Sequence, residues 1–300
     1  MRHLSILALC ALLLTSCSLF KGSADTSKKA SNEKKEEDDP FKPWEKTLKD
    51  AEKIDGFLPL HKKEDRTLYA EIPTDLLGQN FGLVMHISKG VGVLNLHDGL
   101  PLSDTRLMRF RKVGHKVHLV HRNPRFRADA GGMRTSMQDN VGHAVVQSFD
   151  IVSRNDSTKN LLIELSDFLV SDYANIGESV KPYFGGTPVS FQSGKSYVDS
   201  VQGFERNVEI DAMLNYQGSD PPILGAGALA DYRSIPVGVR YSFFKLPETP
   251  MQARFADDRV GYFTDAIKDF SKDKQSDPYL RYVNRWRLAP SDTAAYRQGE

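Results

Sequence analysis

The densest group of chemically active side chains in this sequence is a basic stretch at residues 105–128. It holds eight arginines or lysines and no acidic residue. Because such a field attracts anions, the stretch predicts a surface for an anionic partner, such as lipid headgroups, lipopolysaccharide or an acidic subdomain. The alternative that stays open is a solvated hairpin face whose charges pair with acids elsewhere. The candidate binding residues are Arg106, Arg109, Arg111, Lys112, Lys116 and Arg122.

Three histidines lie in the same stretch at spacings of three residues. In a strand, His115 and His121 share one face and His118 points to the other, so the three do not converge as zinc ligands do. No histidine in the chain precedes a glutamate, so the H-E-x-x-H motif of zinc peptidases is absent. The sequence therefore predicts no metal, no cofactor and no catalytic residue within this chain.

Two glycine-containing patterns resemble nucleotide-binding loops, but neither has the surrounding sequence that such a loop requires. Gly194-Lys195-Ser196 lacks the first glycine of a phosphate-binding loop, since Val189 stands there. The glycines at 225–230 follow a Pro-Pro pair and belong to no βαβ unit. A G-x-S-x-G nucleophile elbow is also absent. These patterns give no support to an enzyme.

The N-terminus has the pattern of a bacterial lipoprotein signal. A basic start precedes an apolar run at 4–14, which is too short to span a bilayer but has the length of a signal peptide core. Leu-Thr-Ser then leads into Cys17, as in a lipobox. The pattern predicts a signal peptide at 1–16 and acylation of Cys17, which would anchor the chain in the cell envelope, at the outer membrane or periplasmic face.

The elements that must position the basic stretch are predicted to be short strands. Alternating or apolar segments are separated by Gly, Asn, Asp and Pro, which indicates a mainly β fold of antiparallel sheets, sandwich or barrel-like, with a short N-terminal helix at 43–54 and few other helices. Two hairpins are predicted, one from 106–113 and 116–121 and one from 144–152 and 161–165. The other predicted strands are residues 67–72, 81–87, 208–216, 237–246 and 260–263.

Composition divides the chain and limits its partners. After the signal peptide, residues 17–39 predict a disordered tether, because Lys21 to Asp39 contains no apolar residue larger than Ala. A mainly β domain is expected at 40–235, and a further segment at 236–300. The formal net charge of +1 argues against a nucleic-acid partner.

Seven segments resemble parts of the front portion of large bacterial zinc-dependent metalloproteases, and those at 246–251, 258–263 and 284–288 come in the family's order and approximate spacing. The N-terminal half of these proteases is a domain of unknown function. The resemblance covers roughly residues 40–290. The segments are 54–60 (IDGFLPL), 68–73 (LYAEIP), 76–81 (LLGQNF), 204–209 (FERNVE), 246–251 (LPETPM), 258–263 (DRVGYF) and 284–288 (NRWRL).

The resemblance implies a lipid-anchored, non-catalytic scaffold or prodomain-like region, inactive alone. The family's zinc helix lies downstream of the NRWRL segment, so zinc is expected only in a catalytic domain that this chain lacks, and that domain is the expected partner. Trp286 is expected to bury its ring, and the aromatic and arginine side chains around it to dock on that domain. The alternative is a standalone envelope lipoprotein that binds an anionic partner through the hairpin at 106–127.

Overall fold

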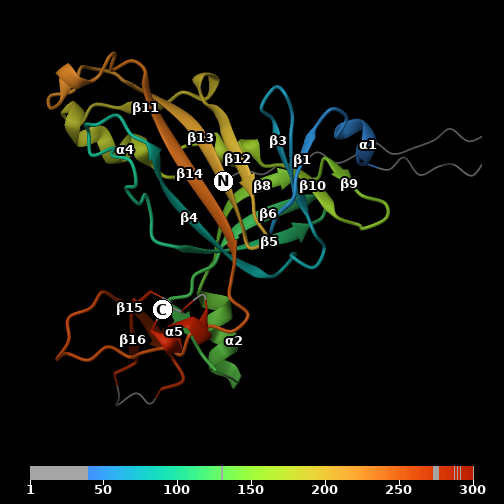
Figure 1. Ribbon diagram of the computed structural model, residues 1–300, viewed down its shortest axis with the longest axis vertical. Helices are drawn as coiled ribbons and strands as arrows, with labels where there is room; N and C mark the ends of the chain where they lie inside the picture. The colour runs from blue at the N-terminus through green and yellow to red at the C-terminus, as the bar shows by residue number, and fades with distance from the viewer. Residues whose placement is uncertain are drawn as a thin grey trace, which may run out of the picture. The chain divides into compact units, whose positions relative to one another are not determined.

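The computed structural model describes residues 40–299 except 130, 273–276, 287, 289 and 291 (Figure 1). The predicted signal peptide, the lipidation site Cys17 and most of the predicted tether lie outside the described residues. All described elements belong to the unit that spans residues 40–300. None of the described helices has the length and apolar character needed to cross a membrane.

The largest sheet has eight strands and curls into a half-barrel (Figure 1). Every pairing within it is antiparallel. This arrangement confirms the predicted mainly β, antiparallel fold class. The strand order is β11 (Val189–Phe191), β13 (Asn207–Gly218), β14 (Ile235–Lys245), β4 (Asn80–Lys89), β5 (Arg106–Val113), β6 (Lys116–His121) and β8 (Ala144–Asp150), with β12 (Tyr197–Gly203) also paired to β13.

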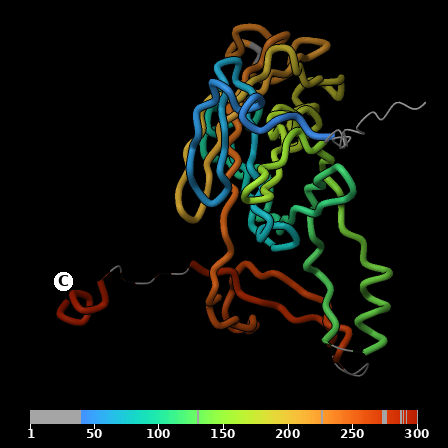
Figure 2. The backbone as a smooth tube through the Cα atoms, turned by 90° about the vertical axis from the view of Figure 1, so that its right-hand side faces the viewer, coloured from blue at the N-terminus to red at the C-terminus, as the bar shows by residue number. Residues whose placement is uncertain are grey.

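Two smaller sheets complete the β structure. The first has the order β1 (Glu52–Ile54), β2 (Leu60–Lys62), β3 (Leu68–Ile72), β10 (Leu161–Glu164) and β9 (Ser153–Arg154). The second has the order β16 (Tyr279–Val283), β15 (Thr264–Asp269) and β7 (Phe126–Arg127), where β7 and β15 run parallel. Figure 2 shows the green segment with β7 and α2 (Gly131–Asn140) reaching the orange and red strands β15 and β16.

The described helices are few and short. Besides α2 they are α1 (Trp44–Thr47), α3 (Ser166–Leu169), α4 (Ile176–Val180) and α5 (Thr293–Gln298). Three 3₁₀ turns are η1 (Lys181–Phe184), η2 (Ser193–Lys195) and η3 (Ala226–Ala228).

One hydrophobic cluster joins the eight-stranded sheet to the five-stranded sheet and to α3 and α4. Strand periodicity explains it, because successive side chains point to opposite faces. On β5, Met108 and Phe110 are fully buried, and on β6 so are Val117 and Leu119. The residues between them therefore face away from this core.

Three local predictions are wrong. The N-terminal helix stops at Thr47 rather than reaching residue 54, because residues 52–54 pair with β2 as β1 and Asp50 has a left-handed φ of 62°. Residues 144–152 and 161–165 do not form a hairpin: β8 pairs with β6, while the turn at Asn155 joins β9 to β10. Residues 260–263 form no strand.

Candidate functional site

A pocket of about 650 Å³ lies on the face of β5, β6 and β8 that points away from the core. Residues of β7 and α2 complete its wall. One acidic side chain, Asp129, contributes to the lining. Its basic and titratable side chains are Arg109, Arg111, Arg122, Arg127, Arg134 and His143.

The strand pattern explains why arginines gather there. Met108 and Phe110 occupy the core face of β5, so Arg109 and Arg111 project from the opposite face. Arg122 directly follows β6, and its backbone N–H donates to the carbonyl of Leu107 at 2.8 Å. The hairpin thus delivers three guanidinium groups to one side of the sheet.

Two of the pocket arginines have fixed partners. The Nε of Arg109 donates to Asn80 Oδ1 at 3.0 Å, which is a neutral acceptor. The Nε of Arg127 donates to Asp269 Oδ2 at 2.9 Å, so its charge is neutralised.

The other three arginines, like Arg109, lack a carboxylate partner among the described residues. Within the described part of the chain, no acidic group comes within ion-pair distance of Arg111, Arg122 or Arg134. The Nε of Arg122 is also buried without a hydrogen-bond partner there. Buried donors are normally satisfied, so this group needs an acceptor that the described chain does not supply.

The crowding of positive charge shifts two pKa values. Burial and the neighbouring Arg122 lower the pKa of Arg109. Burial, then Arg122, Arg109 and Arg111, lower the pKa of His143 below its usual 6.5. The Nδ1 of His143 accepts from the backbone N–H of Asn123 at 3.3 Å. The neutral imidazole therefore completes a pocket that favours negative charge.

The structure divides the six sequence-predicted binding residues into two sets of three. Arg109, Arg111 and Arg122 line the pocket together. The other three do not line it. Arg106 stacks over the ring of Tyr173, with its guanidinium carbon 4.3 Å from the ring centroid. Lys112 is exposed and alternates along β5 with Arg109 and Arg111, so it lies on the other face of the strand. Lys116 pairs with Asp150.

The nearby histidines are also separated. His118 lies opposite Arg111 across the β5–β6 pair, whereas His121 lies opposite the buried Met108. The ring of His115 packs edge-on against Phe41, with the centroids 5.5 Å apart. In the described ranges, no three His, Cys, Asp or Glu side chains are placed to hold a metal ion.

Three basic or titratable residues of the pocket were not predicted from the sequence. Arg127 lies inside the basic stretch but was not among the candidates, and Arg134 and His143 come from α2 and the turn after it. Helix α2 buries no side chain, so it has no apolar stripe that periodicity could detect. The available signal was His143 itself, directly before the predicted strand at 144.

The pKa of His143 provides a first test of the pocket. Replacing Arg122 by Gln is expected to raise this pKa, because it removes the positive charge that lowers the pKa most while keeping a polar side chain. Arg106→Gln should raise the pKa of His121, which burial and Arg106 lower, and leave His143 unchanged. Both are measured by NMR titration of the imidazole protons. An unchanged pKa of His143 in the Arg122 variant would contradict the placement of Arg122 beside His143 in the pocket.

Protonation of His143 also links the pocket to pH. Its pKa is lower in the folded chain than in the unfolded chain, so the associated stability is present above about 6.5 and is lost as the pH falls toward the folded pKa. A bound anion would raise this pKa, so binding should strengthen as the pH falls in the same range.

Comparison with known proteins gives one match. A family model described as a domain of unknown function (DUF5117) matches residues 102–291, which is more than half of the chain and includes every residue that lines the pocket. No curated protein and no solved structure matches the chain.

Proposed function

The chain belongs to the DUF5117 family of domains of unknown function, and we propose that it is a binding module for an anionic group on a partner molecule. The observation that supports the proposal is a set of four arginines in one pocket that have no carboxylate partner among the described residues: Arg109, Arg111, Arg122 and Arg134. Guanidinium groups bind carboxylates and phosphates in a bidentate manner. Like charges held together repel, and a bound anion would relieve that repulsion.

Titration of the chain with two simple anions tests the proposal. Pentaglutamate and inorganic pyrophosphate are added separately at about 50 mM and about 200 mM salt, and binding is followed by calorimetry. Saturable binding of at least one anion that weakens at higher salt is expected, because exposed charge interactions are screened. No binding of either anion at the lower salt concentration would sink the proposal.

We propose further that Cys17 carries a lipid that holds this module in the cell envelope, on the grounds of the lipobox pattern before it. Cys17→Ser should then move the protein out of the membrane fraction. Retention of the variant in that fraction would contradict the anchor.

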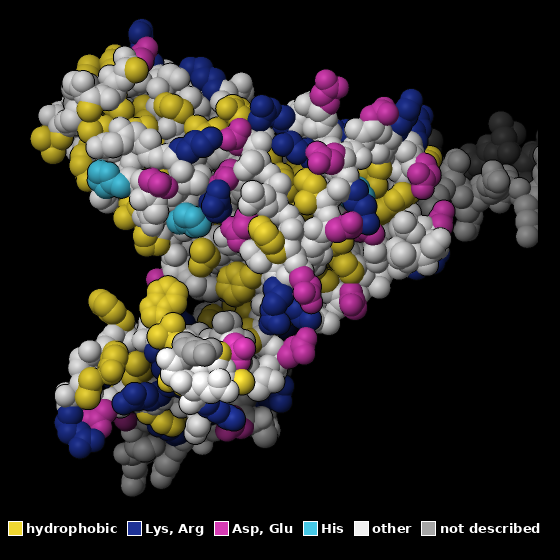
Figure 3. All heavy atoms as spheres, viewed as in Figure 1, with side chains coloured by type: hydrophobic (Ala, Val, Ile, Leu, Met, Phe, Trp, Pro, Cys, Tyr) yellow, Lys and Arg dark blue, Asp and Glu magenta, His cyan; other side chains and the backbone are white. Residues whose placement is uncertain are grey.

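A second candidate function is favoured by the surface near the C-terminus. The side chains of Phe263, Trp286 and Leu288 are 89%, 87% and 91% exposed. The predicted burial of Trp286 within this chain is therefore wrong. In Figure 3 yellow hydrophobic side chains lie among blue and magenta charged ones on the lower part of the molecule. Large exposed apolar groups mark interaction surfaces.

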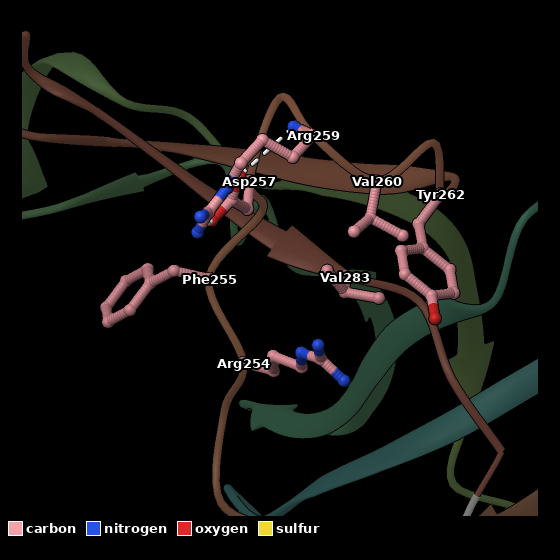
Figure 4. A pocket seen from close by; sticks show the side chains of 7 residues that line it. All are labelled: Arg254, Phe255, Asp257, Arg259, Val260, Tyr262 and Val283. Atoms are coloured by element: carbon pink, nitrogen blue, oxygen red, sulfur yellow. Dashed lines mark hydrogen bonds and ion pairs between the residues drawn. The ribbon is translucent and has the colours of Figure 1, made fainter.

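A shallow pocket of about 330 Å³ adjoins this surface. Figure 4 shows Val260, Tyr262 and Val283 close together on one side of it and the Asp257–Arg259 pair on the other. Arg259 Nε donates to Asp257 Oδ1 at 2.8 Å. In the second candidate function, the chain is the non-catalytic scaffold or prodomain-like part of a zinc-dependent metalloprotease, and this surface docks on the catalytic domain.

Phe263→Ser together with Trp286→Ser tests the docking surface. The free energy of unfolding should change by less than about 0.5 kcal/mol per site, because the side chains are exposed, while binding of a hydrophobic dye should fall. A large loss of stability would show that these side chains are packed in solution. Chelator-sensitive peptide cleavage by the chain with added zinc would contradict the non-catalytic role.

A further inference from the structure

We propose that the anionic partner is an extended acidic peptide segment that pairs with the free edge of β8 and places its carboxylates among the pocket arginines. The inference rests on the proposed anion-binding function and names the partner's chemistry. Two observations carry it: an open strand edge, and an arginine pocket that shares residues with that edge.

Strand β8 ends the eight-stranded sheet and pairs with β6 alone in it. Within the described residues, no backbone hydrogen bond reaches the other edge of residues 144–150. β10 approaches this edge only at the C-terminal end of β8, where the N–H of Val152 donates to the carbonyl of Leu162 at 2.9 Å. Proteins usually protect such an edge with Lys, Pro or a covering element. Residues 144–150 read AVVQSFD, with no Pro and no basic residue, and the side chain of Val145 is 47% exposed.

The direction of the free amide groups follows from the ladder. The N–H of Ile151 donates to the carbonyl of His115 at 3.0 Å, so it points toward β6. Alternation along the strand then directs the N–H of Phe149 toward β6 as well, and that of Ser148 outward. Asp150 lies beside the end of β10, so the outward N–H and C=O groups available to a further strand are those of residues 144–148.

The edge and the pocket meet at two residues. Val145 lies on β8 and His143 immediately precedes the strand, and both line the pocket. A strand added beside β8 would lie about 4.8 Å from it. Every second side chain of that strand would then lie on the same face of the sheet as the pocket and next to its wall. Strand addition uses backbone hydrogen bonds for affinity and alternate side-chain pockets for specificity.

The lining of the pocket favours a peptide over a small isolated anion. Apolar side chains stand among the arginines, including Val120, Met137, Val141 and Val145. An extended peptide with acidic and apolar side chains alternating on one face can contact both the arginines and the apolar side chains of the pocket. Inorganic phosphate has no apolar group that could contact the apolar side chains. The pocket volume of about 650 Å³ also accommodates several side chains.

The test uses three labelled peptides of the same length as β8, seven residues. The first carries Glu and Val alternating on one face, with Thr between them. The second replaces each Glu by Gln. The third keeps Glu but is N-methylated at the amides that would pair with β8, which leaves the protein unchanged. Binding to the full chain is measured by fluorescence anisotropy, with inorganic phosphate and anionic vesicles as competitors.

We expect the first peptide to bind, and both altered peptides to bind at least about tenfold more weakly. Equal binding of the N-methylated peptide would overturn strand pairing and leave the anion-binding function intact. Equal binding of the Gln peptide would overturn recognition of the peptide's carboxylates by the arginines, and the titration with pentaglutamate and pyrophosphate would still decide the anion-binding function. No binding of the first peptide, with binding of phosphate or vesicles, would overturn the peptide assignment alone.

A variant of the protein gives an independent readout. Ser148→Pro removes an outward N–H but no hydrogen bond of the β6–β8 ladder, and Ser148→Ala is its control. The Pro variant should lose binding of the first peptide by at least about tenfold, and the Ala variant should keep it. Retained binding in a folded Pro variant would overturn the use of this edge.

Discussion

Replacing Arg109, Arg111 and Arg122 together by Gln is expected to lower the affinity of the chain for anions by about 100-fold or more. Each guanidinium that binds an anion contributes about 1.5–3 kcal/mol through charge-assisted hydrogen bonds, and about 1.4 kcal/mol corresponds to a factor of ten. The three contributions are not additive, because the side chains share one pocket. Calorimetric titration with pentaglutamate measures the loss.

The other three of the six candidate binding residues form a matched control. Arg106→Gln, Lys112→Gln and Lys116→Gln together remove the same charge from outside the pocket. Because this variant loses only long-range attraction to the anion, its binding should weaken by only a few-fold at physiological salt. If both triple variants lost affinity equally, the net field of the hairpin would explain binding, and the pocket would not be the site.

The hairpin that carries the site was predictable from local pattern. Residues 106–113 and 116–121 form β5 and β6 as predicted, because apolar residues alternate along both strands and Gly114 takes the left-handed φ of 57° that the turn requires. The same alternation already separates the arginines by face. Met108 and Phe110 fix the core side, so Arg109 and Arg111 must point away from it.

The partners of the basic residues were not predictable, because they come from distant parts of the chain. Asp269 neutralises Arg127 across 142 positions of sequence, and Asp150 pairs with Lys116 across 34. Which arginines stay unpaired thus depends on the tertiary fold. The sequence showed a concentration of positive charge, and the fold determines which part of it is free to bind.

The wrong hairpin at 144–165 has a related cause. The apolar pattern of both segments was recognised, but local pattern does not say which strand pairs with which. Two residues, Ser153 and Arg154, take the chain into the five-stranded sheet, where they pair with β10. As a result β8 is left as an edge strand beside the pocket.

Phe110→Ala is expected to destabilise the fold by about 3–5 kcal/mol, although the residue stands between two arginines of the site. Its ring is fully buried and packs against Phe81 with the centroids 5.0 Å apart, so truncation removes apolar burial and leaves a cavity. Val113→Ala on the same strand should change stability by less than about 0.5 kcal/mol, since Val113 is exposed. Denaturant unfolding measures both.

Anion binding by the folded fraction of the Phe110→Ala variant should remain close to that of the parent chain. Phe110 and the pocket arginines lie on opposite faces of β5, and the β4–β5–β6 backbone pairing that positions Arg109 and Arg111 does not depend on the Phe110 ring. The two variants should therefore have different defects. Phe110→Ala should lower the free energy of unfolding and leave anion binding intact, whereas the arginine triple variant should lose anion affinity. Loss of binding in folded Phe110→Ala would show that core packing sets the arginine geometry, and the two faces of the strand would have to be treated as one coupled site.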